Sequence, residues 1–226
     1  MTVNRAMVAA LLVTGLFSVC LAAQRTPKSI LRDQNRRIDE SVAPGDTALT
    51  VIDRPIGPLM VLAPPDMSLT SWGFDLADAV ILARIEGRRG ELTSNADWIR
   101  SQVVVRPLET FKNEGGEFRR DGTLLLLEEG GELTIKGARV TATVSSERPF
   151  AEGQQYLMFL KFDRLTKRFL YSSSWTYHLS DGRFTTLTVP DDPNAEPNKI
   201  EMDWSDHVLM ELRDLSKKLK TAERAR

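Results

Sequence analysis

The stretch WIRSQVVVRP, residues 98–107, decides the fold because apolar and polar side chains alternate along it with a period of two. One face is apolar and the other is polar: Ile99, Val103 and Val105 against Arg100, Gln102 and Arg106. Such alternation predicts a β-strand with one buried face. Pro107 has no backbone N–H to donate, so it predicts a sheet edge or a bulge where this strand ends.

The same period of two continues on both sides of this stretch. Residues 79–86 predict a strand before it, and the polar residues 87–97 predict the loop that joins the two strands. Further strands are predicted after it, over residues 123–128, 132–136, 138–144, 155–163, 169–175 and 184–189. Gly137 and Gly182 predict tight turns between neighbouring strands. The sequence therefore predicts a mainly β domain over residues 66–190.

Helices are predicted at both ends of the β domain. Residues 68–77 predict a short helix before the first strand, and residues 205–226 predict a C-terminal amphipathic helix with Ser205 as its N-cap. The apolar stripe of the second helix is spaced four, three and four residues apart: Val208, Leu212, Leu215 and Leu219. Residues 191–204 predict a linker, and residues 24–65 predict an irregular tether interrupted by prolines.

Two of the predicted strands, at residues 124–127 and 156–162, are apolar on both faces. A sheet face that meets water usually carries polar side chains, so something must cover the second face of these strands. The candidates are the apolar stripe of the C-terminal helix and a partner protein. We expect the helix, because it requires no second molecule.

Residues 1–23 predict that the chain is exported. Arg5 precedes an uncharged run, and small residues precede a cleavage site at Ala22 or Ala23. These features predict a cleaved signal peptide and a secreted or periplasmic protein. An uncleaved membrane anchor stays open as an alternative. Lipid attachment at Cys20 also stays open, although the residues before Cys20 depart from the lipoprotein pattern.

Cys20 is the chain's single cysteine, so cleavage leaves a mature chain without thiols. Disulfides, thiol catalysis and cysteine-ligated zinc are then excluded. The formal net charge of −1 argues against a nucleic-acid binder. We expect no cofactor and no metal, because His178 and His207 show no short ligand spacing. Membrane contact is expected only through an uncleaved signal or a lipid anchor.

Arginines near the predicted strands form a candidate ligand face, with two aromatic residues as stacking groups. Its members are Arg88, Arg89, Trp98, Arg100, Arg106, Phe118, Arg119 and Arg120. Such a face suits an acidic polymer or a protein of the envelope. Solvated surface arginines without a ligand are the simpler alternative.

His178 lies near Asp181 and three consecutive serines, residues 172–174, which suggests a Ser-His-Asp set. The serines fall within a predicted strand, and no Gly-x-Ser-x-Gly sequence surrounds them. We therefore expect no enzyme. A hydrolase that uses His178 stays an alternative, and it requires a serine oxygen or an acid within hydrogen-bond reach of the ring.

Several stretches of the β region carry a family resemblance. They are LADAVILARIEG (76–87), RSQVVVRPLETFKNEG (100–115), GQQYLMFLKF (153–162), FLYSSSW (169–175) and LSDGR (179–183). Together they resemble the netrin-like and tissue-inhibitor-of-metalloproteinase type of OB-fold barrel, and uncharacterised secreted bacterial proteins built on that plan. The resemblance covers residues 75–190, rests on strand pattern, and implies a small five-stranded antiparallel barrel.

Protease inhibition does not follow from this resemblance. Those inhibitors insert an N-terminal cysteine pair into a protease's zinc site, and this mature chain has no cysteine. We expect a secreted or periplasmic, non-enzymatic binding module. An envelope assembly component that docks through the apolar strands is the alternative, besides the hydrolase.

Overall fold

The computed structural model describes residues 28–34, 36–53, 69–114, 118, 122–145, 147–187 and 205–224. The chain is mainly β, as the period of two predicts, with three α-helices among these residues. The predicted signal peptide with Cys20, the linker 191–204, and Arg119 and Arg120 lie outside the described residues. None of the described helices combines the length and the hydropathy that a membrane crossing requires.

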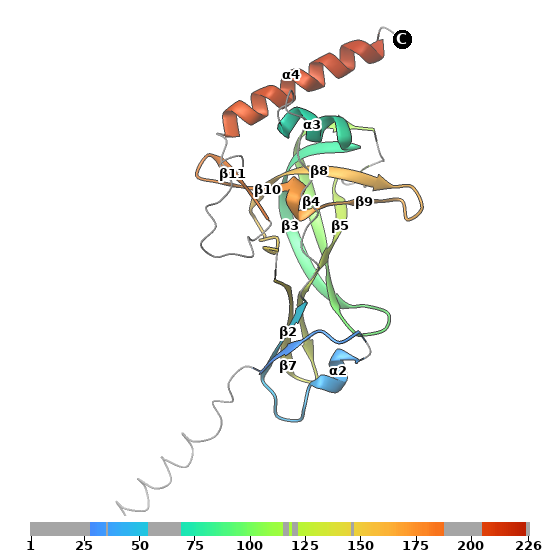
Figure 1. Ribbon diagram of the computed structural model, residues 1–226, viewed down its shortest axis with the longest axis vertical. Coiled ribbons are helices and arrows are strands. Elements are labelled where there is room, and N and C mark those ends of the chain that lie inside the picture. Colours follow the sequence, from blue (N-terminus) through green and yellow to red (C-terminus); the bar gives the residue numbers. More distant parts are fainter. Residues whose placement is uncertain are drawn as a thin grey trace, which may run out of the picture.

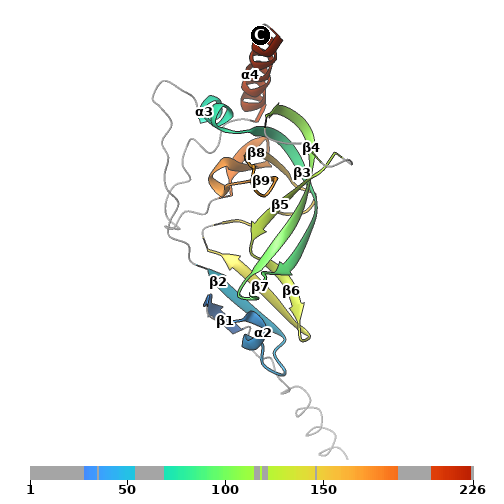
Figure 2. The same ribbon diagram turned by 90° about the vertical axis from the view of Figure 1, so that its right-hand side faces the viewer.

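The larger sheet is antiparallel, with the strand order β11-β10-β8-β3-β4-β5 and with β9 paired to β8. Its strands are β3 (Ala79–Leu92), β4 (Ile99–Asn113), β5 (Leu124–Glu129), β8 (Gln155–Asp163), β9 (Arg168–Leu170), β10 (Thr176–Ser180) and β11 (Arg183–Thr186). β3 and β4 are long and curved, and they run along most of the molecule (Figure 2). Most of the predicted loop 87–97 is therefore strand, because β3 continues to Leu92.

A smaller sheet lies at the other end of these two long strands (Figure 1). Its order is β1 (Lys28–Leu31), β2 (Ala48–Asp53), β7 (Ala138–Val144) and β6 (Gly131–Ile135), with β1, β2 and β7 mutually parallel. The short helix α2 (Ile38–Ser41) connects its first two strands. Residues 28–53 thus correct the prediction of an irregular tether, because Leu49 and Val51 alternate inward and are buried.

Two helices cover one face of the larger sheet at the end away from the smaller sheet (Figure 1). They are α3 (Leu69–Leu76) and α4 (Ser205–Arg224). Three apolar residues of α4, namely Val208, Leu209 and Leu212, pack in one cluster with Leu157 and Phe159 of β8. The second apolar face of β8 is therefore covered within the chain. The corresponding side chains of β5 are only half-buried and lie outside this cluster.

The larger sheet is open. Its path begins at β11 and ends at β5, and no pairing between these two strands closes it within the described residues. The closed OB-like barrel is therefore not confirmed. After β5 the chain leaves the larger sheet at Gly130 and Gly131, which have φ angles of 93° and 151°, and continues as β6 in the smaller sheet. A side chain at Gly131 would collide with the Ser101 hydroxyl, which donates to the Gly130 carbonyl at 2.9 Å.

Candidate functional site

A cavity whose lining includes several charged side chains lies where the two sheets meet, and we call it the seam cavity. It consists of two hollows of about 100 Å³ and about 260 Å³, which share Arg88 and Glu132. The smaller hollow is lined by Arg88, Glu128, Glu129, residues 131–132, residues 141–144 and residues 147–149. The larger is lined by Arg88, Gly90, Ser101, Glu132, Phe150 and Glu152. Strands β3, β4 and β5 of the larger sheet and strands β6 and β7 of the smaller sheet thus supply most of the lining.

The wall contains a buried ion pair. Glu128 on β5 is 3% exposed, and its Oε2 accepts a hydrogen bond from Arg88 Nε of β3 at 2.5 Å. Its other oxygen accepts the backbone N–H of Phe150 at 2.7 Å. Burial raises the pKa of Glu128, while the Arg88 charge and these two hydrogen bonds act in the opposite direction. Glu128 therefore joins β3, β5 and the segment before β8 at one point.

A cluster of three aromatic side chains adjoins this ion pair. Phe150 is buried with its ring 5.0 Å from that of Tyr156 and 5.1 Å from that of Tyr171. The Tyr156 hydroxyl accepts the N–H of Ala151 at 2.9 Å, which fixes the segment against β8. Burial strongly raises the pKa of Tyr171, and the charges of three nearby carboxylates raise it further: Glu128, Glu147 and Glu129. All three carboxylates also line the smaller hollow.

The carboxylates of the cavity differ in their partners. Glu129 accepts from Arg100 at 2.8 Å, and Glu132 accepts from Arg139 at 2.5 Å. Glu147 instead accepts the hydroxyl of Ser173 at 2.9 Å. Within the described part of the chain, Glu147 is thus held by a neutral donor rather than by an arginine. Glu152 likewise accepts a neutral donor, the backbone N–H of Arg88, at 2.8 Å. Glu147 and Glu152 are thus the lining carboxylates that keep most of their capacity for a further charged partner.

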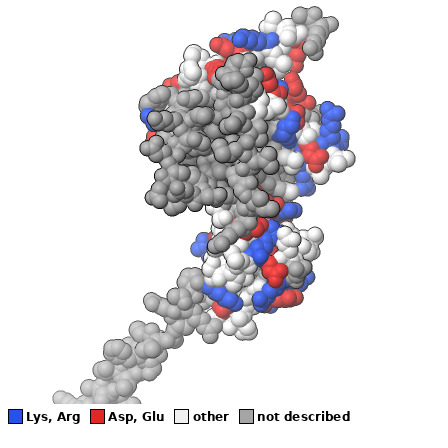
Figure 3. Space-filling model, in the orientation of Figure 1, with Lys and Arg blue, Asp and Glu red and all other residues white. Residues whose placement is uncertain are grey.

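The predicted arginine face does not assemble as one exposed surface. Arg88 turns inward to Glu128, whereas Arg89, its neighbour on the strand, projects to the opposite side and is exposed. Arg100 pairs with Glu129, and Arg106 pairs with Glu86. Phe118 packs partly buried against the core, with its ring 6.2 Å from that of Phe169. Acidic and basic side chains also lie interspersed on the described surface (Figure 3).

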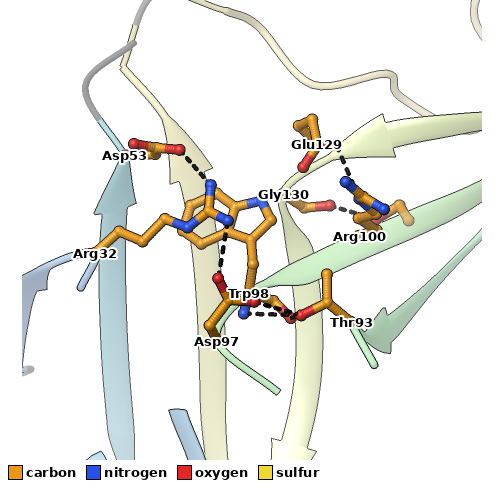
Figure 4. A network of polar contacts seen from close by, with 9 residues as sticks. Arg32, Asp53, Thr93, Asp97, Trp98, Arg100, Glu129 and Gly130 are labelled. Carbon is orange, nitrogen blue, oxygen red and sulfur yellow. Dashed lines mark hydrogen bonds and ion pairs between the residues drawn. The ribbon is translucent and has the colours of Figure 1, made fainter. Parts of the chain in front are cut away.

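Trp98 is fully buried, so its ring is part of the core and does not contribute to an exposed ligand face. The Arg32 guanidinium lies 4.7 Å from the centre of its ring and pairs with Asp53 at 2.7 Å and Asp97 at 3.1 Å (Figure 4). Thr93 donates its hydroxyl to Asp97 at 2.8 Å. This network ties the segment after β1 to β2 and to the loop between β3 and β4.

His178 does not form the Ser-His-Asp set that the hydrolase alternative requires. The partner of its Nε2 is the Gln154 amide oxygen at 3.3 Å, and its ring lies 5.1 Å from that of Tyr156. Among the nearby serines, Ser173 donates to Glu147 rather than to the histidine. Burial and the charge of Arg148 lower the pKa of His178. No cluster of three or more potential metal ligands occurs among the described residues.

Glu128 and Glu147 were not among the residues predicted to form a site. For Glu128 the sequence contains a usable signal, because it continues the inward-facing positions of Leu124 and Leu126 with a charged side chain. A charged residue at an inward position of a strand is costly to bury and therefore indicates a special environment. Glu147 has no such signal, since the contact to Ser173 depends on tertiary structure.

Comparisons of the chain with protein-family models, with curated proteins and with solved structures gave no match. The seam cavity and the predicted export signal are therefore the basis for any functional proposal.

Proposed function

We propose that this chain is an exported, non-enzymatic binding module that holds part of a partner protein in the seam cavity. The carrying observation is the concave site lined by the ion pair of Arg88 with the buried Glu128. Ionisable groups whose pKa is shifted by burial in a cavity are enriched at functional sites. Export follows from the predicted signal peptide, and a secreted or periplasmic location is part of the same proposal.

The pairing of the arginines favours a protein over an acidic polymer as the partner. Arg88, Arg100 and Arg106 each have a carboxylate partner within the chain, so an acidic polymer would have to displace these contacts. A polymer that binds through charge needs a surface with an excess of one sign. The antiparallel β3-β4-β5 order is compatible with the netrin-like resemblance, which stays a prediction.

The two alternatives have less support. A hydrolase would need a serine oxygen or an acid on the His178 ring, whose partner is the Gln154 amide. An assembly component that docks through the doubly apolar strands would need the second face of β8 to be open. That face is covered by α4 through Leu212 and its neighbours.

Site-specific photo-crosslinking in the native envelope tests the proposal. A photoreactive residue replaces Thr143, which is exposed and lines the cavity, and in a matched control it replaces Leu165, which is 94% exposed in the turn between β8 and β9. We expect a discrete protein adduct from position 143 that is missing from position 165. Equal adducts from both positions, or none from position 143, would contradict binding at the seam.

A further inference from the structure

We propose that the group bound in the seam cavity is a basic side chain, Lys or Arg, of the partner protein. This inference rests on the proposed function and adds the chemistry of the ligand to it.

The charges of the cavity favour a cation. Its walls contain five carboxylates against two guanidinium groups: Glu128, Glu129, Glu132, Glu147 and Glu152 against Arg88 and Arg148. Arg100 and Arg139 reach two of these carboxylates from outside the lining. Glu147 and Glu152 are then the positions where a further cation gains most, because their partners are neutral donors, the Ser173 hydroxyl and the Arg88 backbone N–H.

The size of the smaller hollow favours the end of a side chain over a whole small molecule. Its volume is about 100 Å³, whereas pockets for complete small ligands have volumes of roughly 300–1,000 Å³ and enclose most of the ligand. The neighbouring larger hollow, of about 260 Å³, is also below that range. An ammonium or guanidinium group on a flexible stem fits the hollow, while the rest of the ligand stays outside, as a partner's backbone would.

The arrangement of donors and acceptors agrees with this assignment. Glu147 and Glu128 both line the smaller hollow, and the charges of both raise the pKa of Tyr171. Thr141 and Thr143 of β7 line the same hollow and supply hydroxyl oxygens, which can accept hydrogen bonds from a cationic donor. Arg88 is held by Glu128 and therefore does not occupy the Glu147 carboxylate.

Titration of the full-length protein with capped amino acids, followed by amide NMR, tests the ligand class. The probes are N-acetyl-lysinamide and N-acetyl-argininamide, with N-acetyl-norleucinamide as the uncharged control and N-acetyl-glutamate amide as the anionic control. We expect saturable shifts of Gly131 and residues 141–144 with the two basic probes only. The variant Glu147→Gln should bind the two basic probes about tenfold more weakly, which is the loss of affinity typical of one charged hydrogen bond. The exposed control Glu223→Gln on α4 should leave the affinity unchanged.

The outcomes separate the two proposals. Binding of the anionic probe instead of the basic probes overturns the ligand class, while an adduct from position 143 still supports binding at the seam. No saturable shifts, or equal affinity in Glu147→Gln and wild type, also overturns the ligand class. If Glu147→Gln does not fold, Glu152→Gln serves in its place, because this exposed residue lines the larger hollow and is also held by a neutral donor. If the photoreactive residue at position 143 gives no protein adduct, the proposed function itself is overturned.

Discussion

Replacing Leu212 with alanine tests whether α4 is an integral part of the fold. Leu212 is 0% exposed and packs with β8 and α3 in one cluster, so the substitution removes buried methyl and methylene groups without exposing a polar atom. The lost transfer free energy is roughly 0.8 kcal/mol for each buried carbon. A residual cavity adds to the cost, and buried Leu→Ala substitutions as a class cost about 2–5 kcal/mol. We expect the free energy of unfolding to fall by about 3 kcal/mol, near the middle of that range.

Urea denaturation followed by circular dichroism measures this change, and hydrogen exchange of the α4 amides shows whether the helix opens locally. Met210→Ala is the matched control, because it truncates a 57% exposed side chain on the same helix and should change stability by less than about 0.5 kcal/mol. Equal stabilities of the two variants would refute the packing of α4 against β8. Exchange of α4 that is already fast in wild type would lead to the same conclusion.

Two further predictions concern the charged groups. Arg32→Gln should cost about 3 kcal/mol in urea denaturation, because it leaves the buried Asp97 carboxylate without its cation, whereas the exposed Arg37→Gln should leave the unfolding midpoint unchanged. Equal midpoints would show that the Arg32 network is dispensable. For Glu128, a raised pKa means that the folded state holds the proton more tightly. Its contribution is present below pH 4.5 and is lost as the pH rises through the folded value. Glu128→Gln should therefore gain stability relative to wild type between pH 4.5 and neutrality, and stability curves that run parallel over this range would contradict the assignment.

The antiparallel strands could be predicted from the sequence because their signal is local. β8 has the predicted bounds 155–163, and the hairpin of β6 and β7 turns at Gly137. The pairing of β2 with β7 could not be predicted in this way. Residues 48–53 lie about ninety positions before their parallel partner, and neither strand specifies the other by its own pattern. Leu49 and Val51 nevertheless alternate, so a strand there was detectable while its neighbour was not.

The candidate site was harder to predict because its residues depend on tertiary contacts. Trp98 suits a stacking surface by type, yet the chain buries it beneath Arg32, which lies 66 residues earlier. The same holds for Arg88, whose role depends on Glu128 forty residues later. A single alternating strand shows which side chains point inward, but it does not show which of them are charged partners. The inward position of Glu128 was the one local indication of a polar site.

The position of the buried pair follows from the way the chain changes sheets. β5 ends at Glu129, and the turn at Gly130 and Gly131 directs the next strand into the smaller sheet. Inward side chains at this transition meet the edge of the core rather than its centre, which leaves room for a cavity between the sheets. Apolar residues of similar volume would usually stabilise such a position at least as well as an ion pair. Packing alone therefore does not explain why a glutamate with a raised pKa, Glu128, occupies this position. Partner binding in the seam cavity would explain it.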